Sequence, residues 1–115
     1  MKKQFDFIQD PSHGWVKVPL MLLIELGIAD QVTSFSYYNN GHVYLEEDCD
    51  ASRFAQAFAD RFGFEPKFRE RVARERRSRV RGYMPFYYGD FSRATNKDVM
   101  QAAIAMGRLE IIHVG

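Results

Sequence analysis

Cysteine and histidine are scarce in this sequence, which has one cysteine, Cys49, and three histidines. A single cysteine excludes a disulfide bond within the chain and is typical of a protein of the reducing cytoplasm. The cysteine and histidines are too few and too scattered for a zinc cluster. Glycine-rich phosphate loops and serine-nucleophile motifs are also missing. The sequence therefore predicts a non-enzymatic protein without a metal or another cofactor.

Long apolar runs are missing as well. The longest one spans residues 20–24, which is far too short to cross a membrane. Met1-Lys2-Lys3 leads into alternating polar and apolar residues rather than into an apolar block, so a secretory leader is not expected. We therefore expect a cytoplasmic location and no contact with a membrane.

Aromatic residues, in contrast, are abundant. The 115 residues include ten Phe and six Tyr, a content that favours a sheet-containing fold. This length fits one domain with one hydrophobic core. No internal repeat or low-complexity linker divides the chain, so residues 1–115 are expected to form a single domain.

Alternation and turn residues predict most elements of the first half. Strands are expected at residues 4–8 and 15–18, separated by a turn at 10–14. Pro19 suits the first turn of a short helix that ends near Leu26. Asn39-Asn40-Gly41 predicts a hairpin between strands at 33–38 and 42–46, because Asn and Gly tolerate positive φ.

The second half begins with a helix that carries Phe54, Phe58 and Phe62 on one stripe and ends at Gly63. A strand is expected at 64–72, and because it contains Pro66 it should either lie at a sheet edge or have this proline near its start. A loop at 73–78 and an extended return at 80–88 should follow. A helix over residues 95–106 and a strand at 109–114 complete the chain. The predicted class is α+β, a mainly antiparallel sheet packed by about three helices.

Charge is balanced over the whole chain, with a formal net charge of +1, but it is unevenly distributed. Residues 67–81 hold eight of the 16 basic residues and only two of the 15 acidic ones. A partner would respond to this local field. Arginine predominates, and its guanidinium suits bidentate pairing with phosphate or carboxylate. The basic residues of this segment are Lys67, Arg69, Arg71, Arg74, Arg76, Arg77, Arg79 and Arg81.

Four runs of the sequence carry a resemblance to a known family. They are HGWVKVP at 13–19, LGIAD at 26–30, SFSY at 34–37 and VYLEEDCD at 43–50. The chain resembles a family of small uncharacterised proteins, with the pattern HGWLKVP…LGIADKISSYSY…YLEEDCD, carried mainly by phages, plasmids and other mobile elements of bacteria. The similarity extends through the basic segment and weakens after about Tyr88. It implies an accessory or counter-defence role, such as an anti-CRISPR-like inhibitor, and brings no assigned catalytic residues.

The basic segment has two functional interpretations. It could contact an acidic surface of a host or phage protein, or it could contact nucleic-acid phosphate directly. Aromatic residues beside it could stack on single-stranded bases, although such residues more often pack within a core. These are Tyr83, Phe86, Tyr87 and Tyr88. A solvated edge strand and loop is the simplest alternative, and the sequence does not define an oligomeric state.

The acidic run Glu46, Glu47, Asp48 and Asp50 is the other charged candidate. It could bind a cation or a basic partner, but it lacks the spacing of a calcium loop, and capping of the following helix by Asp48 or Asp50 explains it more simply. Cys49 could pair with His13 as an activated nucleophile if the two met in space. The neighbouring carboxylates disfavour a thiolate there, so we expect a buried structural cysteine and predict no catalytic residue.

Overall fold

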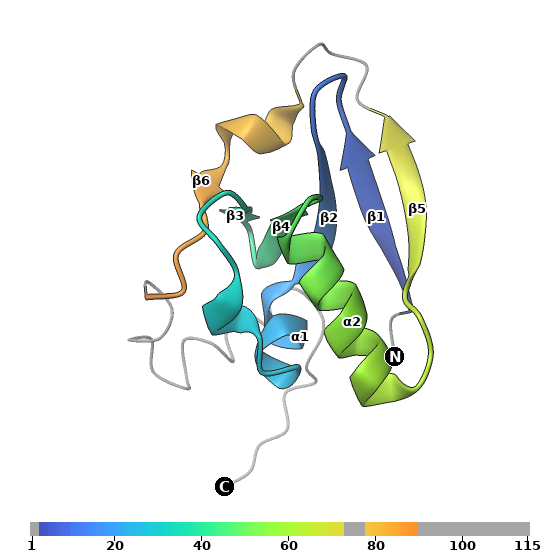
Figure 1. The fold of residues 1–115 in the computed structure, drawn as a ribbon. Helices are drawn as coiled ribbons and strands as arrows, with labels where there is room; N and C mark the ends of the chain where they lie inside the picture. The colour runs from blue at the N-terminus through green and yellow to red at the C-terminus, as the bar shows by residue number, and fades with distance from the viewer. Residues whose placement is uncertain (1–2, 73–77, 90–115) are drawn as a thin grey trace, which may run out of the picture.

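The computed structural model describes residues 3–72 and 78–89, which contain one six-stranded sheet in the order β5-β1-β2-β4-β3-β6 (Figure 1). The strands are β1 (Gln4–Gln9), β2 (Gly14–Pro19), β3 (Tyr37–Asn39), β4 (His42–Glu46), β5 (Lys67–Val72) and β6 (Met84–Pro85). The helices are α1 (Leu20–Glu25), α2 (Asp50–Phe62) and the short 3₁₀ helices η1 (Ala29–Gln31) and η2 (Arg79–Gly82). The expected α+β class is confirmed, with two α-helices in the described residues. The helix expected at 95–106 and the strand at 109–114 lie outside them.

The sheet is mixed. β5 pairs in parallel with β1, whereas the other described pairings, β1–β2, β2–β4, β3–β4 and β3–β6, are antiparallel. The chain passes from β4 through α2 to β5, and β4 and β5 run in the same direction because β1–β2 and β2–β4 are both antiparallel. A helical crossover is how strands of the same direction are usually joined. Among the described strands β5 lies at the edge of the sheet, one of the two expected positions. It begins at Lys67 rather than at residue 64, so Pro66 lies just outside the strand.

α2 and α1 cover one face of the sheet and form the main core with it (Figure 1). Phe5 of β1 packs edge-to-face against Phe54 and Phe58 of α2, with ring centroids 5.1 and 5.8 Å apart. The predicted aromatic stripe is therefore the buried side of α2, although Phe62 is only half-buried. Gly63 ends the helix with φ +81°, a left-handed conformation that glycine adopts without steric cost.

The β3–β4 hairpin is shorter than the sequence suggests. Its two-residue turn is Asn40-Gly41, with φ values of +48° and +81°, as the predicted asparagine–glycine signal requires. Residues 33–36, expected to be strand, form a turn closed by a hydrogen bond from Ser36 N–H to Thr33 O at 3.2 Å. Phe35 consequently points outward and is 74% exposed. Its alternation with the serines therefore does not reflect a buried strand face.

Asp50 explains that turn and corrects the capping prediction. The N-cap of α2 is Cys49, and neither Asp48 nor Asp50 caps the helix through its side chain. The buried Asp50 Oδ2 instead accepts hydrogen bonds from Thr33 N–H at 3.0 Å, Thr33 Oγ1 at 2.7 Å and Ser36 Oγ at 2.6 Å. This carboxylate therefore holds the 33–36 turn against the start of α2, a long-range role that local capping rules do not anticipate.

Three other expectations need adjustment. Pro19 ends β2 in an extended conformation (φ −61°, ψ 135°), and α1 starts at Leu20. Residues 80–88 contain most of η2 and the two-residue strand β6 rather than a simple extended return. Of the loop expected at 73–78, only Ser78 is described, and it is buried. None of the described helices is long and apolar enough to cross a membrane.

Replacing Phe58 should test the core directly. Phe58→Ala should lower the free energy of unfolding by about 3–5 kcal/mol, because this fully buried ring contacts Phe5, Phe54, Phe62 and Phe64. Urea unfolding followed by circular dichroism measures the change. Phe64→Ala is the matched control and should cost clearly less, because Phe64 is partly exposed. A loss below about 1 kcal/mol for Phe58→Ala would contradict this packing.

Candidate binding surface on the open face of the sheet

The face of the sheet opposite α2 carries the four basic residues of strands β1, β2 and β5. Strand register places Lys17, Asp6 and Arg69 in one row, with Lys17 opposite Asp6 and Asp6 opposite Arg69. Because side chains alternate along β5, Lys67 and Arg71 lie on the same face as Arg69. The sequence interpretation named these β5 cations, but it did not include Lys17.

Among the described residues, Asp6 is the carboxylate that pairs with these cations. Its Oδ1 accepts from Arg69 Nε at 3.1 Å and Nη2 at 3.0 Å, and it lies 3.8 Å from Arg71 Nε. Two arginines thus share one carboxylate, and Lys17 and Lys67 add further positive charge nearby. We call Lys17, Lys67, Arg69 and Arg71, with Asp6 between them, the basic edge.

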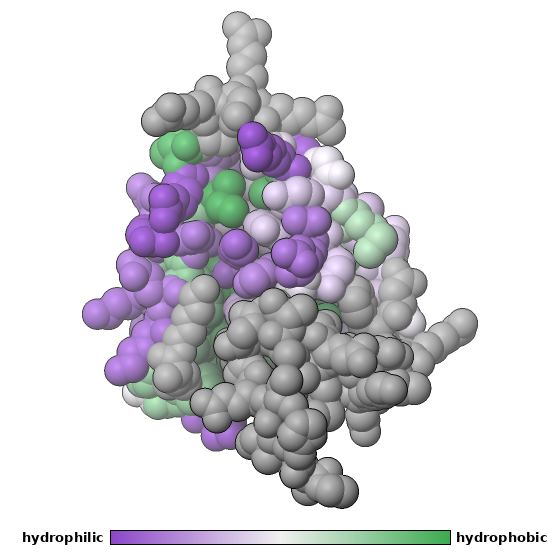
Figure 2. All heavy atoms as spheres, turned by 180° about the vertical axis from the view of Figure 1, so that it is seen from behind, coloured by the Kyte–Doolittle hydropathy of each residue, from purple (hydrophilic) through white to green (hydrophobic). Residues whose placement is uncertain are grey.

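The basic edge is open to solvent. All six residues of β5 are exposed, whereas Lys17 and Asp6 are half-buried further into the sheet. In the view from behind α2, hydrophilic side chains gather along the sheet edge formed by β5 (Figure 2). The exposed position leaves the guanidinium groups accessible to a partner, and Asp6 restricts their orientation.

The second half of the basic segment does not continue this surface. Arg74, Arg76 and Arg77 lie outside the described residues. Arg79 is exposed on η2, a separate element beside the sheet. The side chain of Arg81 is only 24% exposed and pairs with Asp10, so this cation serves the fold.

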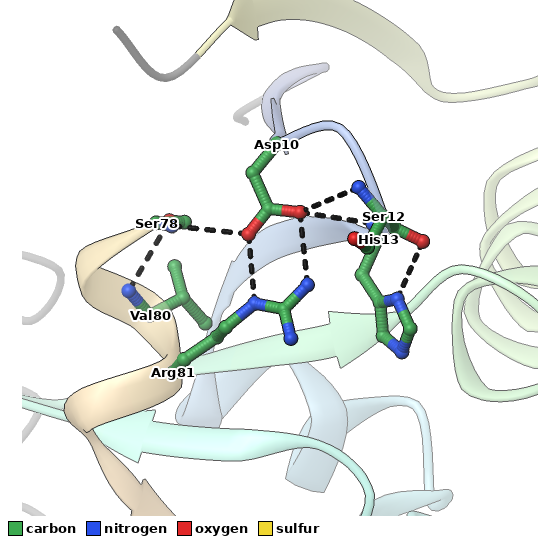
Figure 3. Close-up of polar contacts among 6 residues, drawn as sticks. All are labelled: Asp10, Ser12, His13, Ser78, Val80 and Arg81. Carbon is green, nitrogen blue, oxygen red and sulfur yellow. Dashed lines mark hydrogen bonds and ion pairs between the residues drawn. The ribbon is translucent and has the colours of Figure 1, made fainter. Parts of the chain in front are cut away.

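Asp10 is the centre of a buried polar network (Figure 3). Its side chain is 0% exposed and accepts from Arg81 Nε at 2.8 Å and Arg81 Nη2 at 3.0 Å. It also accepts from the backbone N–H groups of Ser12 at 3.0 Å, His13 at 2.9 Å and Ser78 at 3.0 Å. The Arg81 guanidinium and these N–H donors hold the pKa of the Asp10 carboxyl far below its usual range, despite the opposing effect of burial. The turn after β1 is thereby fixed to η2.

A small aromatic cluster lies under η2 on the same face of the sheet. Trp15, Tyr44 and Val80 are buried there, with Tyr83 packed on Tyr44 at a centroid distance of 5.0 Å. The Arg81 guanidinium lies 5.6 Å from the Trp15 ring, within the range of a cation–π contact. Burial raises the pKa of Tyr44 to about 12, and Tyr83 adds to the shift, so the hydroxyl is neutral at physiological pH.

The four aromatic residues proposed from sequence do not form one platform. Phe86 is fully buried in the main core, and Tyr88 packs against that core. Tyr83 belongs to the cluster under η2, and Tyr87 is exposed. Stacking on bases would need several exposed rings close together, and these positions do not provide them.

The acidic run is also divided between environments. Asp50 is buried, as described above, and Glu46 accepts from the backbone N–H groups of Asp48 at 2.7 Å and Cys49 at 3.2 Å. Glu47 lies on the α2 side of the sheet, close to Gly14. The four carboxylates therefore do not make a single surface. The described residues contain no group of three or more side chains suited to hold a metal ion.

His13 and Cys49 line one cavity of about 490 Å³ at the end of the sheet next to η2. Trp15, Arg81 and the exposed Phe35 also contribute to its wall. Cys49 is an exposed free thiol, not the buried one expected from sequence. Within the described residues, no hydrogen bond joins His13 to Cys49, so the geometry does not assemble an activated nucleophile.

A second cavity of about 390 Å³ lies between α2 and strands β1 and β5. Phe68 contributes to its wall, and this side chain is 43% exposed. The remaining lining residues are Phe7, Val16, Glu47, Ala51, Ser52, Ala55 and Glu70. A groove lined by apolar side chains together with Glu47, Ser52 and Glu70 therefore lies beside β5, on the face opposite the basic edge.

Searches of protein families, of curated proteins and of solved structures return no match to this chain.

Sequence reasoning missed Asp6, Asp10 and Lys17. Asp6 and Lys17 occupy alternate positions of short strands. This alternation predicts that they lie outside the core, but it does not predict that they lie near β5. The parallel pairing of β1 with β5, which brings Asp6 to Arg69, joins residues 63 positions apart. Asp10 was recognised as a turn residue, but its partner Arg81 is 71 positions away and was assigned to the binding surface instead.

Removing the Asp10 charge should destabilise the fold. Asp10→Asn should lower the free energy of unfolding by about 3 kcal/mol at pH 7, because it leaves the Arg81 guanidinium without its buried partner. Urea unfolding at pH 7 measures the difference. Asp6→Asn is the matched control on the same strand region and should cost less than about 1 kcal/mol, because its pairs are exposed.

The Asp10–Arg81 ion pair predicts that the free energy of unfolding depends on pH. The folded-state pKa of Asp10 is depressed, so its contribution is complete above the unfolded pKa of about 4 and is lost as pH falls toward the folded value. The stability difference between wild type and Asp10→Asn should therefore shrink as pH falls below about 4. Urea titrations between neutral and acidic pH measure it. A difference that stays constant through this range would contradict the assigned ion pair.

Proposed function

We propose that this chain is a non-enzymatic binding protein that docks its basic edge onto an acidic surface of another protein. The observation that carries the proposal is a group of four cations on one face of the sheet, of which Arg69 and Arg71 pair with a single carboxylate, Asp6. A field of this kind steers an acidic partner toward one orientation and favours rapid association.

Asp6 supports docking by orienting its neighbours. An arginine held at 3.0 Å by a carboxylate loses little further side-chain freedom when a partner binds. Because Arg69 and Arg71 share this carboxylate, the basic edge keeps a net positive charge. Each guanidinium also has donors that Asp6 does not use, and these can pair with carboxylates of a partner.

The resemblance to proteins of phages and plasmids supports a host protein as the target. A mobile element gains from blocking host defence, so an inhibitor of a defence assembly, such as a CRISPR complex, fits both the resemblance and a charged docking surface. In this proposal the chain acts in the host cytoplasm and needs no cofactor. Binding alone would obstruct the target.

Direct nucleic-acid binding through the 67–81 segment is the alternative. Alternate cations on an exposed strand favour it, since phosphates attract such charges without regard to sequence. The aromatic rings on the same face oppose it, because Trp15 and Tyr44 are buried under η2 and cannot stack on bases. The protein-docking proposal needs no such rings, so the geometry supports it better.

Charge reversal at the basic edge should abolish docking. Arg69→Glu/Arg71→Glu should reduce recovery of host partners at least about tenfold in quantitative pull-downs, because like charges would then face the acidic surface. Arg61→Glu, an exposed change in the last turn of α2, is the control and should leave recovery unchanged. Circular dichroism verifies that each variant is folded.

The same proteins distinguish the alternative. Wild type should give no gel shift with DNA or RNA at low salt if it docks on protein alone. Binding to oligonucleotides that weakens steeply as salt rises, and that disappears in the charge-reversed variant, would support the nucleic-acid function instead. Equal recovery of the same host proteins by wild type and Arg69→Glu/Arg71→Glu would refute docking through the basic edge.

A further inference from the structure

The outer side of β5 presents backbone groups that no strand in residues 3–72 and 78–89 pairs with. Lys67 N–H donates to Lys3 O at 2.8 Å, so the N–H groups of Lys67, Arg69 and Arg71 point toward the β1 side. Successive N–H groups along a strand point to opposite sides. The N–H and C=O groups of Phe68, Glu70 and Val72 therefore point outward, away from the sheet.

The side chains of β5 divide into a charged and a mainly apolar set. Lys67, Arg69 and Arg71 lie on the open face, and Phe68, Glu70 and Val72 lie on the face that α2 covers elsewhere. Phe68 is 43% exposed and Val72 is 72% exposed, so α2 leaves this end of the sheet uncovered. The groove of about 390 Å³ lies next to Phe68 on that face. Apolar surface is thus available beside the outward backbone groups.

A second copy of this chain is a poor match for the edge. A two-fold axis through a continuous antiparallel sheet would keep the open faces on one side. If the two β5 strands paired with Arg69 at the centre, Arg69 of one copy would lie opposite Arg69 of the other, and Lys67 opposite Arg71. Like charges directly opposite on neighbouring strands are destabilising. The matching strand must therefore bring carboxylates to these positions.

We propose that β5 accepts an extended segment of a partner protein as an additional strand, and that this segment alternates acidic and apolar side chains. The inference rests on the proposed function and specifies how the acidic partner is recognised. Acidic side chains would lie opposite Lys67, Arg69 and Arg71, about 5 Å away on the open face. Apolar side chains between them would contact Phe68 and Val72. Backbone hydrogen bonds to Phe68, Glu70 and Val72 would supply the part of the affinity that does not depend on the side chains of the segment.

The charges also determine which strands are rejected. Lysine and arginine on an edge strand discourage pairing with uncharged or basic segments, because the cations lose hydration without gaining a partner. An acidic segment compensates that loss directly. The same three side chains thus protect the edge from indiscriminate pairing and select for a particular ligand.

Two substitutions at Glu70 isolate the backbone contribution. Glu70→Ala and Glu70→Pro both remove the carboxylate, but only proline also removes an outward N–H. The probe is a fluorescein-labelled eight-residue peptide of alternating glutamate and valine, and a peptide with the glutamates and valines in two blocks is its control. Fluorescence anisotropy measures the affinities. Hydrogen exchange followed by NMR measures protection of the Phe68, Glu70 and Val72 amides.

The alternating peptide should bind wild type and Glu70→Ala similarly, and at least about tenfold more weakly to Glu70→Pro. It should also bind wild type at least about tenfold more tightly than the block peptide does, and it should protect the three outward amides. Equal affinity of the alternating peptide for Glu70→Pro and Glu70→Ala, or equal binding of the two peptides by wild type, would overturn strand addition. A dimer in sedimentation experiments that is lost only in Glu70→Pro would overturn the choice of a partner segment.

The two proposals fail in different ways. If Arg69→Glu/Arg71→Glu weakens peptide and host-protein binding while Glu70→Pro weakens neither relative to Glu70→Ala, strand addition is wrong and docking by charge stands. If neither the charge reversal nor Glu70→Pro affects binding, both proposals are wrong. If only nucleic acid binds wild type, the protein partner itself is wrong.

Discussion

The buried ion pair between Asp10 and Arg81 positions much of this structure. Asp10 closes the turn between β1 and β2, and it also accepts from Ser78 and Arg81 at the far end of the described chain. Desolvating a carboxylate is costly unless its hydrogen bonds are satisfied, and here five donors satisfy them. The network fixes η2 over Trp15 and Tyr44 and directs the chain on to β6 and the buried Phe86. One side of the open face is thereby covered.

That pair also divides a basic segment that is continuous in sequence. Arg81 is directed inward by a carboxylate that only the folded turn can offer, whereas Lys67, Arg69 and Arg71 remain on the exposed edge of the sheet. The difference arises because Arg81 pairs with Asp10, whereas Arg69 and Arg71 pair with Asp6. Asp10 is fully buried and its pair stabilises the fold, but Asp6 is partly exposed and shared, so it orients cations without neutralising them all.

Local signals in the sequence account for several of the elements but not for their partners. Asn40-Gly41 and Gly63 required positive φ, and Phe54 and Phe58 shared a helical stripe, so the hairpin and α2 could be predicted from neighbouring residues alone. The parallel pairing of β5 with β1 and the role of Asp50 could not, because each depends on contacts between distant segments. The candidate site was limited in the same way. Alternation identified the β5 cations, but Lys17 and Asp6 join them only through strand register.

The position of β5 decides what kind of recognition the charges can support. On a central strand, Lys67, Arg69 and Arg71 would present only side chains, and any acidic surface of suitable shape would satisfy them. At the edge, the cations flank backbone donors and acceptors whose spacing matches another strand and no other common element. Coulomb attraction at such a surface is weak in water and sensitive to salt, whereas hydrogen bonds formed in register fix one alignment. Specificity therefore arises from charge attraction and backbone hydrogen bonds together. The charges select an acidic segment, and the backbone hydrogen bonds determine its register.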